Sequence, residues 1–167
     1  GSETAPVQIV EFLDFECPAC RALYRSMKGL ESRFGDQVSI VLKNFPLDQE
    51  CNALLEQPGH RYACLAAQFA RCAGEQGAFW KVVDQLMSVE LFEGDPPVLE
   101  LREQMLTLAS DAGLDRQGLE ECLGSPRQRS KVIRDIEEGV KLGVEGTPAV
   151  WVNGRKVTQP QLNVPVI

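Results

Sequence analysis

Hydrophobic residues follow different spacings along the chain, and each spacing predicts a type of element. Residues 7–13 form a short, apolar, β-branched stretch that is typical of a buried strand. In residues 17–34 apolar side chains recur every three or four positions, which predicts one buried face of a helix. Residues 38–43 form a second apolar stretch, and because a helix separates the two predicted strands, we expect them to be parallel. The predicted helix face contains Cys20, Leu23, Tyr24, Met27, Leu30 and Phe34.

A series of helices is predicted in the middle of the chain. Residues 61–73, 78–91 and 98–110 have helical hydrophobic periodicity, and the first of these is small and apolar almost all round. Asp115 and Ser125 are predicted to be the N-caps of two further helices. The predicted core positions include Trp80, Val132, Ile133, Ile136, Val140 and Trp151.

Beyond residue 146 the hydrophobic spacing changes to every second residue. Residues 149–152 are predicted to be a strand, Asn153-Gly154 a hairpin turn, and residues 155–157 the returning strand. This order predicts an α/β core with a helical block between its second strand and its last helix. We expect residues 1–167 to form a single domain, with the helical insertion at approximately 49–124.

The composition is that of a globular protein, and the charge disfavours two kinds of partner. The 167 residues are 44% hydrophobic and 25% charged. A net charge of −7 argues against binding to nucleic acid or to anionic membrane surfaces. The sequence has neither a membrane-spanning run nor a signal peptide. Gly1-Ser2 is typical of residues left by cloning, so we expect the natural N-terminus to be missing. The absence of a signal peptide therefore gives no information about where the protein is located.

The motif Cys17-Pro18-Ala19-Cys20 lies where the first predicted strand meets the first predicted helix. Unpaired backbone N–H groups and the helix dipole favour a thiolate at this position, so Cys17 is predicted to be the exposed, reactive sulfur. Cys20 lies one turn further on, where it can form a disulfide with Cys17. A structural disulfide or half of a zinc site is the alternative, and the strand before and the helix after make it less favoured.

Four further cysteines lie outside this motif. Because their number is even, an oxidising compartment would pair them into two disulfides, whereas the alternative is four buried free thiols. Cys64 and Cys72 are about 12 Å apart along one predicted helix, too far for a disulfide. We favour Cys51–Cys64 with Cys72–Cys122 over Cys51–Cys72 with Cys64–Cys122, because it closes shorter loops. A zinc site of Cys51, His60, Cys64 and Cys72 is disfavoured by its spacing, and His60 is expected to be a loop or helix-start residue.

The order of these motifs resembles a known family. A strand, a C-x-x-C motif, a helix and a distant Thr147-Pro148 before a hairpin are similar to the thioredoxin fold. The helical block is similar to that of the DsbA-like branch, so the fold class implied is an α/β thioredoxin-like fold with a helical insertion. The stretch from Asn44 to Leu47, with Cys51-Asn52, His60 and Ala63-Cys64 beyond it, resembles the DsbA-like domains associated with bacterial vitamin K epoxide reductase homologues.

The resemblance implies roles for particular residues. Cys17 would be the sulfur that exchanges with substrate, and Cys20 the buried resolving sulfur. Glu11 would be a buried acid that transfers protons to the resolving cysteine, although a solvent-facing glutamate is an alternative. The Thr147-Pro148 bond would be cis and beside Cys17, leaving the backbone of Thr147 free to pair with a substrate strand. The implied substrate-binding residues are Pro18, Ala19, Thr147 and Pro148.

The resemblance also implies a function. It is that of a monomeric, extracytoplasmic thiol:disulfide oxidoreductase of the bacterial periplasm, with no cofactor or metal besides the Cys17–Cys20 disulfide. Its partners would be reduced proteins and a membrane reoxidising partner of the DsbB or vitamin K epoxide reductase type. A reductase or isomerase, or a non-catalytic thioredoxin-like binding module, remains an alternative. The best-known oxidants of this branch have His at the position of Ala19, so we expect a less depressed Cys17 pKa and a less oxidising pair here.

Overall fold

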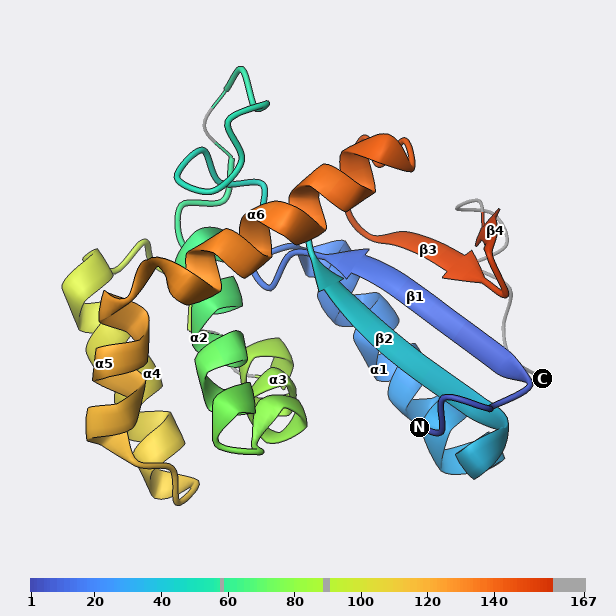
Figure 1. Cartoon of the computed structure of the whole chain (residues 1–167). Coiled ribbons are helices and arrows are strands. Elements are labelled where there is room, and N and C mark those ends of the chain that lie inside the picture. The colour runs from blue at the N-terminus through green and yellow to red at the C-terminus, as the bar shows by residue number, and fades with distance from the viewer. Residues whose placement is uncertain (58, 89–90, 158–167) are drawn as a thin grey trace.

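A mixed sheet and a block of helices make up the molecule (Figure 1). The computed structural model describes residues 1–57, 59–88 and 91–157, and the proline-containing tail from residue 158 lies outside the described residues. The strands are β1 (Val7–Leu13), β2 (Val38–Asn44), β3 (Ala149–Val152) and β4 (Arg155–Val157). The helices are α1 (Pro18–Phe34), the 3-10 turn η1 (Gly35–Gln37), α2 (Ala63–Glu75), α3 (Phe79–Ser88), α4 (Val98–Asp111), α5 (Arg116–Gly124) and α6 (Pro126–Lys141).

The strand order in the sheet is β2-β1-β3-β4, which places β1 in the interior. β1 and β2 are parallel, as the intervening helix predicted, with Val7 opposite Val38. β3 runs antiparallel to β1, with Val150 opposite Glu11, and β4 returns along β3 after the Asn153-Gly154 turn. The predicted hairpin is therefore confirmed.

Alternate side chains of β1 serve two separate parts of the core. Ile9 belongs to a cluster with Met27 of α1, on the face where α1 lies behind the sheet in Figure 1. Phe12 packs on the opposite face, edge-on to Phe45 and Trp151. Because Glu11 is two residues from Ile9, its side chain lies on the α1 face, toward the start of that helix.

The helices from α2 to α5 follow β2 in the chain and lie beside the sheet in Figure 1. α2 is buried on most sides, as its small apolar residues predicted. Asp115 accepts hydrogen bonds from the backbone N–H groups of Gln117 and Gly118, and Ser125 accepts one from Arg127, so both predicted N-caps are confirmed. Among the described residues, none of the helices has the length and hydrophobicity that crossing a bilayer requires.

The structure pairs Cys51 with Cys64 and Cys72 with Cys122, which is the connectivity favoured from the sequence. The Cα atoms are 5.6 Å and 5.8 Å apart, within the usual range for disulfides. The zinc site considered above required thiolates at three of these positions, and all three sulfurs are instead bonded to another sulfur.

Several predicted core positions are wrong. Trp80, Val140 and Phe34 are exposed by 40%, 43% and 36%, because each lies at the edge of its helix face rather than over the core. On α6 the buried positions are Gln128, Val132, Asp135, Ile136 and Gly139. The first and second middle helices also differ from prediction: α2 begins and ends two residues later, and α3 ends at Ser88, with residues 89–90 outside the description.

Candidate active site

The C-x-x-C motif lies at the junction of β1 and α1, as its flanking patterns predicted. Cys17 is the N-cap residue of α1, and Pro18 occupies the first helical position, where a missing N–H costs nothing. Cys17 and Cys20 are free thiols and are exposed by only 7% and 0%. The expected exposure of Cys17 is therefore wrong for the reduced form, in which Pro18 and Ala19 are the exposed members of the motif.

The pKa of the Cys17 thiol is lowered from 9.0 to about 5. The largest cause is a hydrogen bond from the Cys20 thiol, and burial opposes it. The backbone N–H groups of Cys20 and Ala19 and a contact with Thr147 lower the pKa further. The helix N-terminus contributes as expected, but the neighbouring thiol contributes more. Cys17 is therefore a thiolate at neutral pH although position 19 is alanine.

Cys20 has the opposite character. Its contact with Cys17 and its burial both raise the pKa of its thiol well above the ordinary value. Its sulfur also accepts a hydrogen bond from the backbone N–H of Asp14, with an N to Sγ distance of 3.5 Å. One sulfur of the motif is thus ionised and the other keeps its proton, so the reduced pair holds a single negative charge.

Glu11 lies beneath this pair and is fully buried. Neither of its carboxylate oxygens has a hydrogen-bond partner among the described residues. Burial, followed by the negative charge of Cys17, raises its pKa from 4.5 to about 8. The solvent-facing alternative for Glu11 is therefore wrong, and its carboxyl can gain or lose a proton near neutral pH.

The Thr147-Pro148 peptide bond is cis, and Thr147 lies against Cys17. The distance from Cys17 Sγ to the carbonyl oxygen of Thr147 is 3.5 Å, although the two residues are 130 positions apart. The fold therefore brings Cys17, Cys20, Glu11, Thr147 and Pro148 to one place. The four remaining predicted site cysteines form the two disulfides and lie outside this group.

A second set of polar residues adjoins the motif and was missed at the sequence level. Asp14, at the end of β1, is almost fully buried and accepts hydrogen bonds from the backbone of Glu16 and Leu47 and from the ring of His60. Glu16 in turn accepts a hydrogen bond from the backbone of Tyr62. His60 does lie in the loop before α2, as expected, but its ring contacts a buried carboxylate. The available signal was the acidic pattern Asp14-Phe15-Glu16 directly before Cys17.

Comparison with known proteins places these residues in a family context. A family model described as Thioredoxin matches residues 1–163. The Na(+)/H(+) antiporter NhaA 3 of Salinispora tropica is 32% identical over 157 residues, covering 93% of this chain and 21% of that protein. The chain thus spans about a fifth of the length of the first antiporter relatives. The probable disulfide bond formation protein D of Bacillus anthracis is 29% identical, covering 92% of this chain and 68% of that protein.

Solved structures are also similar to this chain. A thioredoxin-like oxidoreductase from Silicibacter pomeroyi is 25% identical with a TM-score of 0.72, covering 95% of this chain and 83% of that one. BdbD from Bacillus subtilis is 21% identical with a TM-score of 0.76, covering 95% of this chain and 82% of that one. The second likeness concerns the fold alone.

Proposed function

Because the chain belongs to the thioredoxin family and has the fold of its DsbA-like members, we propose that it is a thiol:disulfide oxidoreductase that acts through Cys17 and Cys20. The observation that carries this proposal is that the pKa values of the two thiols are shifted in opposite directions. Cys17 has a pKa of about 5, whereas the pKa of buried Cys20 is raised. A thiolate of low pKa is a good leaving group, so a disulfide formed with Cys17 is readily exchanged.

The reaction begins with the oxidised Cys17–Cys20 pair. A substrate thiolate attacks Cys17 Sγ, which forms a substrate–Cys17 disulfide and releases Cys20 as a thiolate that takes up a proton. A second substrate thiolate attacks the substrate sulfur of the mixed disulfide and expels Cys17 as a thiolate. The substrate leaves with one new disulfide, and the two electrons of that bond remain on the reduced pair.

Glu11 is proposed to supply and receive the proton of Cys20. Its negative charge is among the causes that raise the pKa of Cys20, so the two groups act on each other. Burial is the largest cause that raises the pKa of Glu11, to about 8 in the reduced protein, so the carboxyl can deliver a proton to the Cys20 thiolate as it forms and then take one up from solvent. An ordinary carboxylate would hold no proton to give at neutral pH.

The substrate is proposed to bind as an extended chain beside Thr147. The cis bond to Pro148 and the contact with Cys17 place backbone groups of Thr147 next to the reacting sulfur. An extended peptide can pair with such groups by adding a strand, which recognises backbone rather than sequence. The exposed Pro18 and Ala19 would form the other side of this binding surface.

We propose that the chain oxidises reduced proteins outside the cytoplasm, in a periplasmic or comparable compartment. Its two further disulfides are typical of an oxidising environment. A membrane partner of the DsbB or vitamin K epoxide reductase type would restore the Cys17–Cys20 disulfide. The relative named as a disulfide bond formation protein supports this direction, while the antiporter relatives show that such a segment also occurs within larger membrane proteins.

Trapping of mixed disulfides tests the chemistry. Incubation of Cys20→Ser with a reduced, unfolded protein that carries a single cysteine, in the presence of a mild oxidant, should accumulate a covalent complex through Cys17, because neither Cys20 nor a second substrate thiol can break the mixed disulfide. Cys17→Ser is the matched control and should trap far less. Equal trapping by both variants would show that the roles are assigned wrongly.

The direction of exchange needs a separate measurement. The oxidised wild type should introduce a disulfide into a reduced peptide in stoichiometric amounts, and its reduction potential against glutathione should lie above that of a structural disulfide. Preferential reduction of insulin would favour the reductase alternative. A pair that reacts with neither substrate would favour a non-catalytic module.

A further inference from the structure

Asp14 holds the active-site loop from several sides at once. Its carbonyl oxygen accepts the backbone N–H of Cys17 at 3.2 Å, and its own N–H is donated to Cys20 Sγ. Its Oδ1 atom accepts the backbone N–H of Glu16 at 2.7 Å. A single buried residue therefore contacts both cysteines of the motif and also Glu16, the residue directly before Cys17.

The ring of His60 attaches to this same carboxylate from another part of the chain. His60 Nδ1 lies 2.9 Å from Asp14 Oδ2, which also accepts the backbone N–H of Leu47 at 2.7 Å. The N–H of His60 is donated to the carbonyl oxygen of Leu47 at 2.8 Å. Any Cβ at Gly59 would collide with that carbonyl, so the chain can approach Leu47 only with glycine before the histidine. His60 is thus fixed through both its backbone and its ring.

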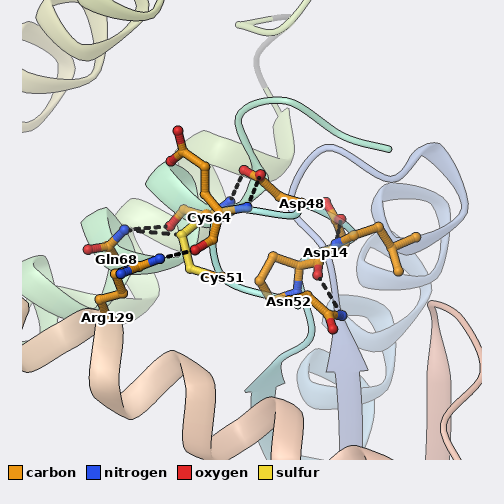
Figure 2. Close-up of a disulfide and its surroundings, with 10 residues drawn as sticks. Asp14, Asp48, Cys51, Asn52, Cys64, Gln68 and Arg129 are labelled. Atoms are coloured by element: carbon orange, nitrogen blue, oxygen red, sulfur yellow. Dashed lines mark hydrogen bonds between the residues drawn. A yellow bond between two sulfur atoms is a disulfide. The ribbon is translucent and has the colours of Figure 1, made fainter. Parts of the chain in front are cut away.

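A disulfide closes the loop that carries His60. Cys51 and Cys64 lie on either side of it, 13 residues apart. Figure 2 shows this disulfide beside Asp48, whose carboxylate accepts the backbone N–H of Cys64 at 3.0 Å, and whose carbonyl accepts those of Cys51 and Asn52. The Nδ2 amide group of the buried Asn52 side chain donates a hydrogen bond to the carbonyl oxygen of Pro46 at 3.2 Å. The segment on which His60 stands is therefore tied at both ends.

On these contacts, and resting on the function proposed above, we propose that Asp14 and His60 form a positioning pair that keeps a cationic imidazole beside the Cys17 thiolate, and that the Cys51–Cys64 disulfide holds the pair in place. The pair supplies from the loop before α2 the positive charge that Ala19 cannot supply from within the motif. His60 does not exchange atoms with substrate and acts only through its charge and its contact with Asp14.

The charges around His60 agree with this assignment. The contact with Asp14 is the largest cause that raises the pKa of His60 above 6.5, while partial burial opposes it. The negative charges of Asp14, Glu16 and Cys17 act in the same direction. His60 therefore carries its proton throughout the pH range in which Cys17 ionises, and because Cys17 stabilises the imidazolium, the imidazolium stabilises the Cys17 thiolate by reciprocal interaction.

Replacement of His60 by asparagine separates charge from hydrogen bonding. The amide of H60N can still donate to Asp14 from about the position of Nδ1, but it carries no charge. We expect the Cys17 pKa, followed by thiolate absorbance at 240 nm of the reduced against the oxidised protein, to rise by about half a unit, as for loss of one charge at a partly exposed site. His60→Ala should show the same rise or more. An unchanged pKa in H60N overturns the proposal, and so does a rise confined to His60→Ala, because that would show a structural role only.

The two disulfides provide a matched pair of variants for the second part. Removal of Cys51–Cys64 as C51A/C64A should raise the Cys17 pKa in the wild-type background but not further in the H60N background, because the disulfide acts through His60. C72A/C122A removes the other disulfide and should leave the Cys17 pKa unchanged. The role of the Cys51–Cys64 disulfide would be refuted if C51A/C64A and C72A/C122A changed the Cys17 pKa equally. It would also be refuted if C51A/C64A raised the Cys17 pKa as much in the H60N background as in the wild-type background.

These measurements do not depend on turnover. A Cys17 titration that responds to His60 supports the positioning pair even if no substrate is oxidised, in which case only the proposed function fails. A Cys17 pKa that does not change when His60 is replaced overturns the positioning pair, even if disulfide exchange is rapid. Circular dichroism of each variant at the same pH values confirms that a folded protein is being titrated.

Discussion

Two thiols three residues apart, Cys17 and Cys20, have pKa values shifted in opposite directions. Their shared hydrogen bond explains both shifts, because a proton donated by Cys20 stabilises the negative charge on Cys17 and is itself held more tightly. The same contact exists only in the reduced state, since the two sulfurs are bonded to each other in the oxidised state. Interactions that stabilise the Cys17 thiolate therefore favour the reduced form and make the pair a stronger oxidant.

Position 19 offers a direct test of that relation. Ala19 is exposed, so a histidine can replace it without repacking the core, and its imidazolium would lie next to Cys17. We expect Ala19→His to lower the Cys17 pKa by about one unit and to raise the reduction potential by about 30 mV, measured against glutathione. Ala19→Gln, which is similar in size and uncharged, is the control. A potential that does not rise in the histidine variant would contradict the argument.

Glu11 predicts an unusual dependence of stability on pH. Below about pH 4.5 its carboxyl is protonated in both the folded and the unfolded states, and it has no effect on stability. As the pH rises from there toward 8, the unfolded chain loses this proton while the folded protein keeps it, so the free energy of unfolding falls. In the oxidised protein the charge of Cys17 is absent, so this window ends somewhat below pH 8, and burial remains as the cause.

Glu11→Gln should remove most of that fall, because its amide does not ionise. We will find the free energy of unfolding of each oxidised protein from urea denaturation at several pH values. Between pH 5 and 8 the wild type is expected to lose up to about 4 kcal/mol more of this free energy than Glu11→Gln. Glu3→Gln, at an exposed glutamate, is the control and should follow the wild-type curve. Parallel curves for the wild type and Glu11→Gln would show that Glu11 is not the residue responsible.

Residues close in sequence were easier to assign from the sequence than contacts between distant ones. The strand–C-x-x-C–helix junction is local, so its geometry was predictable, and the place of Glu11 and Thr147-Pro148 came from the family resemblance. The contact between Asp14 and His60 joins residues 46 positions apart through a loop with no periodic pattern, and nothing in that stretch distinguishes it from a solvated loop. The sequence also did not show that the Cys20 thiol, rather than the helix end, is the largest cause of the lowered Cys17 pKa, because both effects are local and only the geometry ranks them.

At the scale of the elements, α6 packs on the sheet through a glycine. A Cβ built at Gly139 would lie 2.8 Å from Cδ2 of Phe45 and 3.1 Å from Cδ1 of Phe12, so the helix and the two rings meet more closely than a larger residue allows. The sequence suggested Val140 as the core position beside it, but Val140 faces outward. Hydrophobic periodicity locates a helix reliably and its buried face only to within one residue, because a buried glycine has no hydrophobic side chain to reveal it.

Two glycine-to-alanine changes should therefore have opposite effects. Gly139→Ala gains about 1 kcal/mol of helix propensity but crowds two aromatic rings, and we expect a net loss of about 1 to 2 kcal/mol of unfolding free energy. Gly29 is at an exposed position of α1, with nothing within 4 Å of a new methyl group, and we expect Gly29→Ala to raise the free energy of unfolding by about 0.5 to 1 kcal/mol. Chemical denaturation measures both. Stabilisation by Gly139→Ala would show that the contact with Phe45 relaxes without cost.

At the scale of the whole molecule, the two disulfides act at different distances from the active site. Cys51–Cys64 lies next to the loop that carries His60, while Cys72–Cys122 links α2 to α5 within the helical block. The sequence favoured this connectivity because it closes shorter loops, but it could not show that only one of the two disulfides borders the active-site loop. That distinction arises from the path of residues 44–57 and 59–64 past the end of β1, and no local sequence pattern predicts this path.

The two disulfides should also differ in their effect on global stability, in the opposite order to their effect on Cys17. All four cysteines are buried, so the packing lost on replacement by alanine is similar, and the length of the closed loop decides the difference. Cys72–Cys122 spans 50 residues and Cys51–Cys64 spans 13. Loop-closure entropy then predicts losses of about 4 kcal/mol for C72A/C122A and about 3 kcal/mol for C51A/C64A, measured by denaturant unfolding.

The expected result is thus a crossover between two measurements on the same two variants. C72A/C122A should be the less stable protein with an unchanged Cys17 pKa, and C51A/C64A the more stable one with a raised Cys17 pKa. A general loosening of the fold would produce the same order in both measurements, because the less stable variant would also have the more disturbed active site. The crossover therefore distinguishes a local link between the Cys51–Cys64 disulfide and the active-site thiolate from a nonspecific loss of stability.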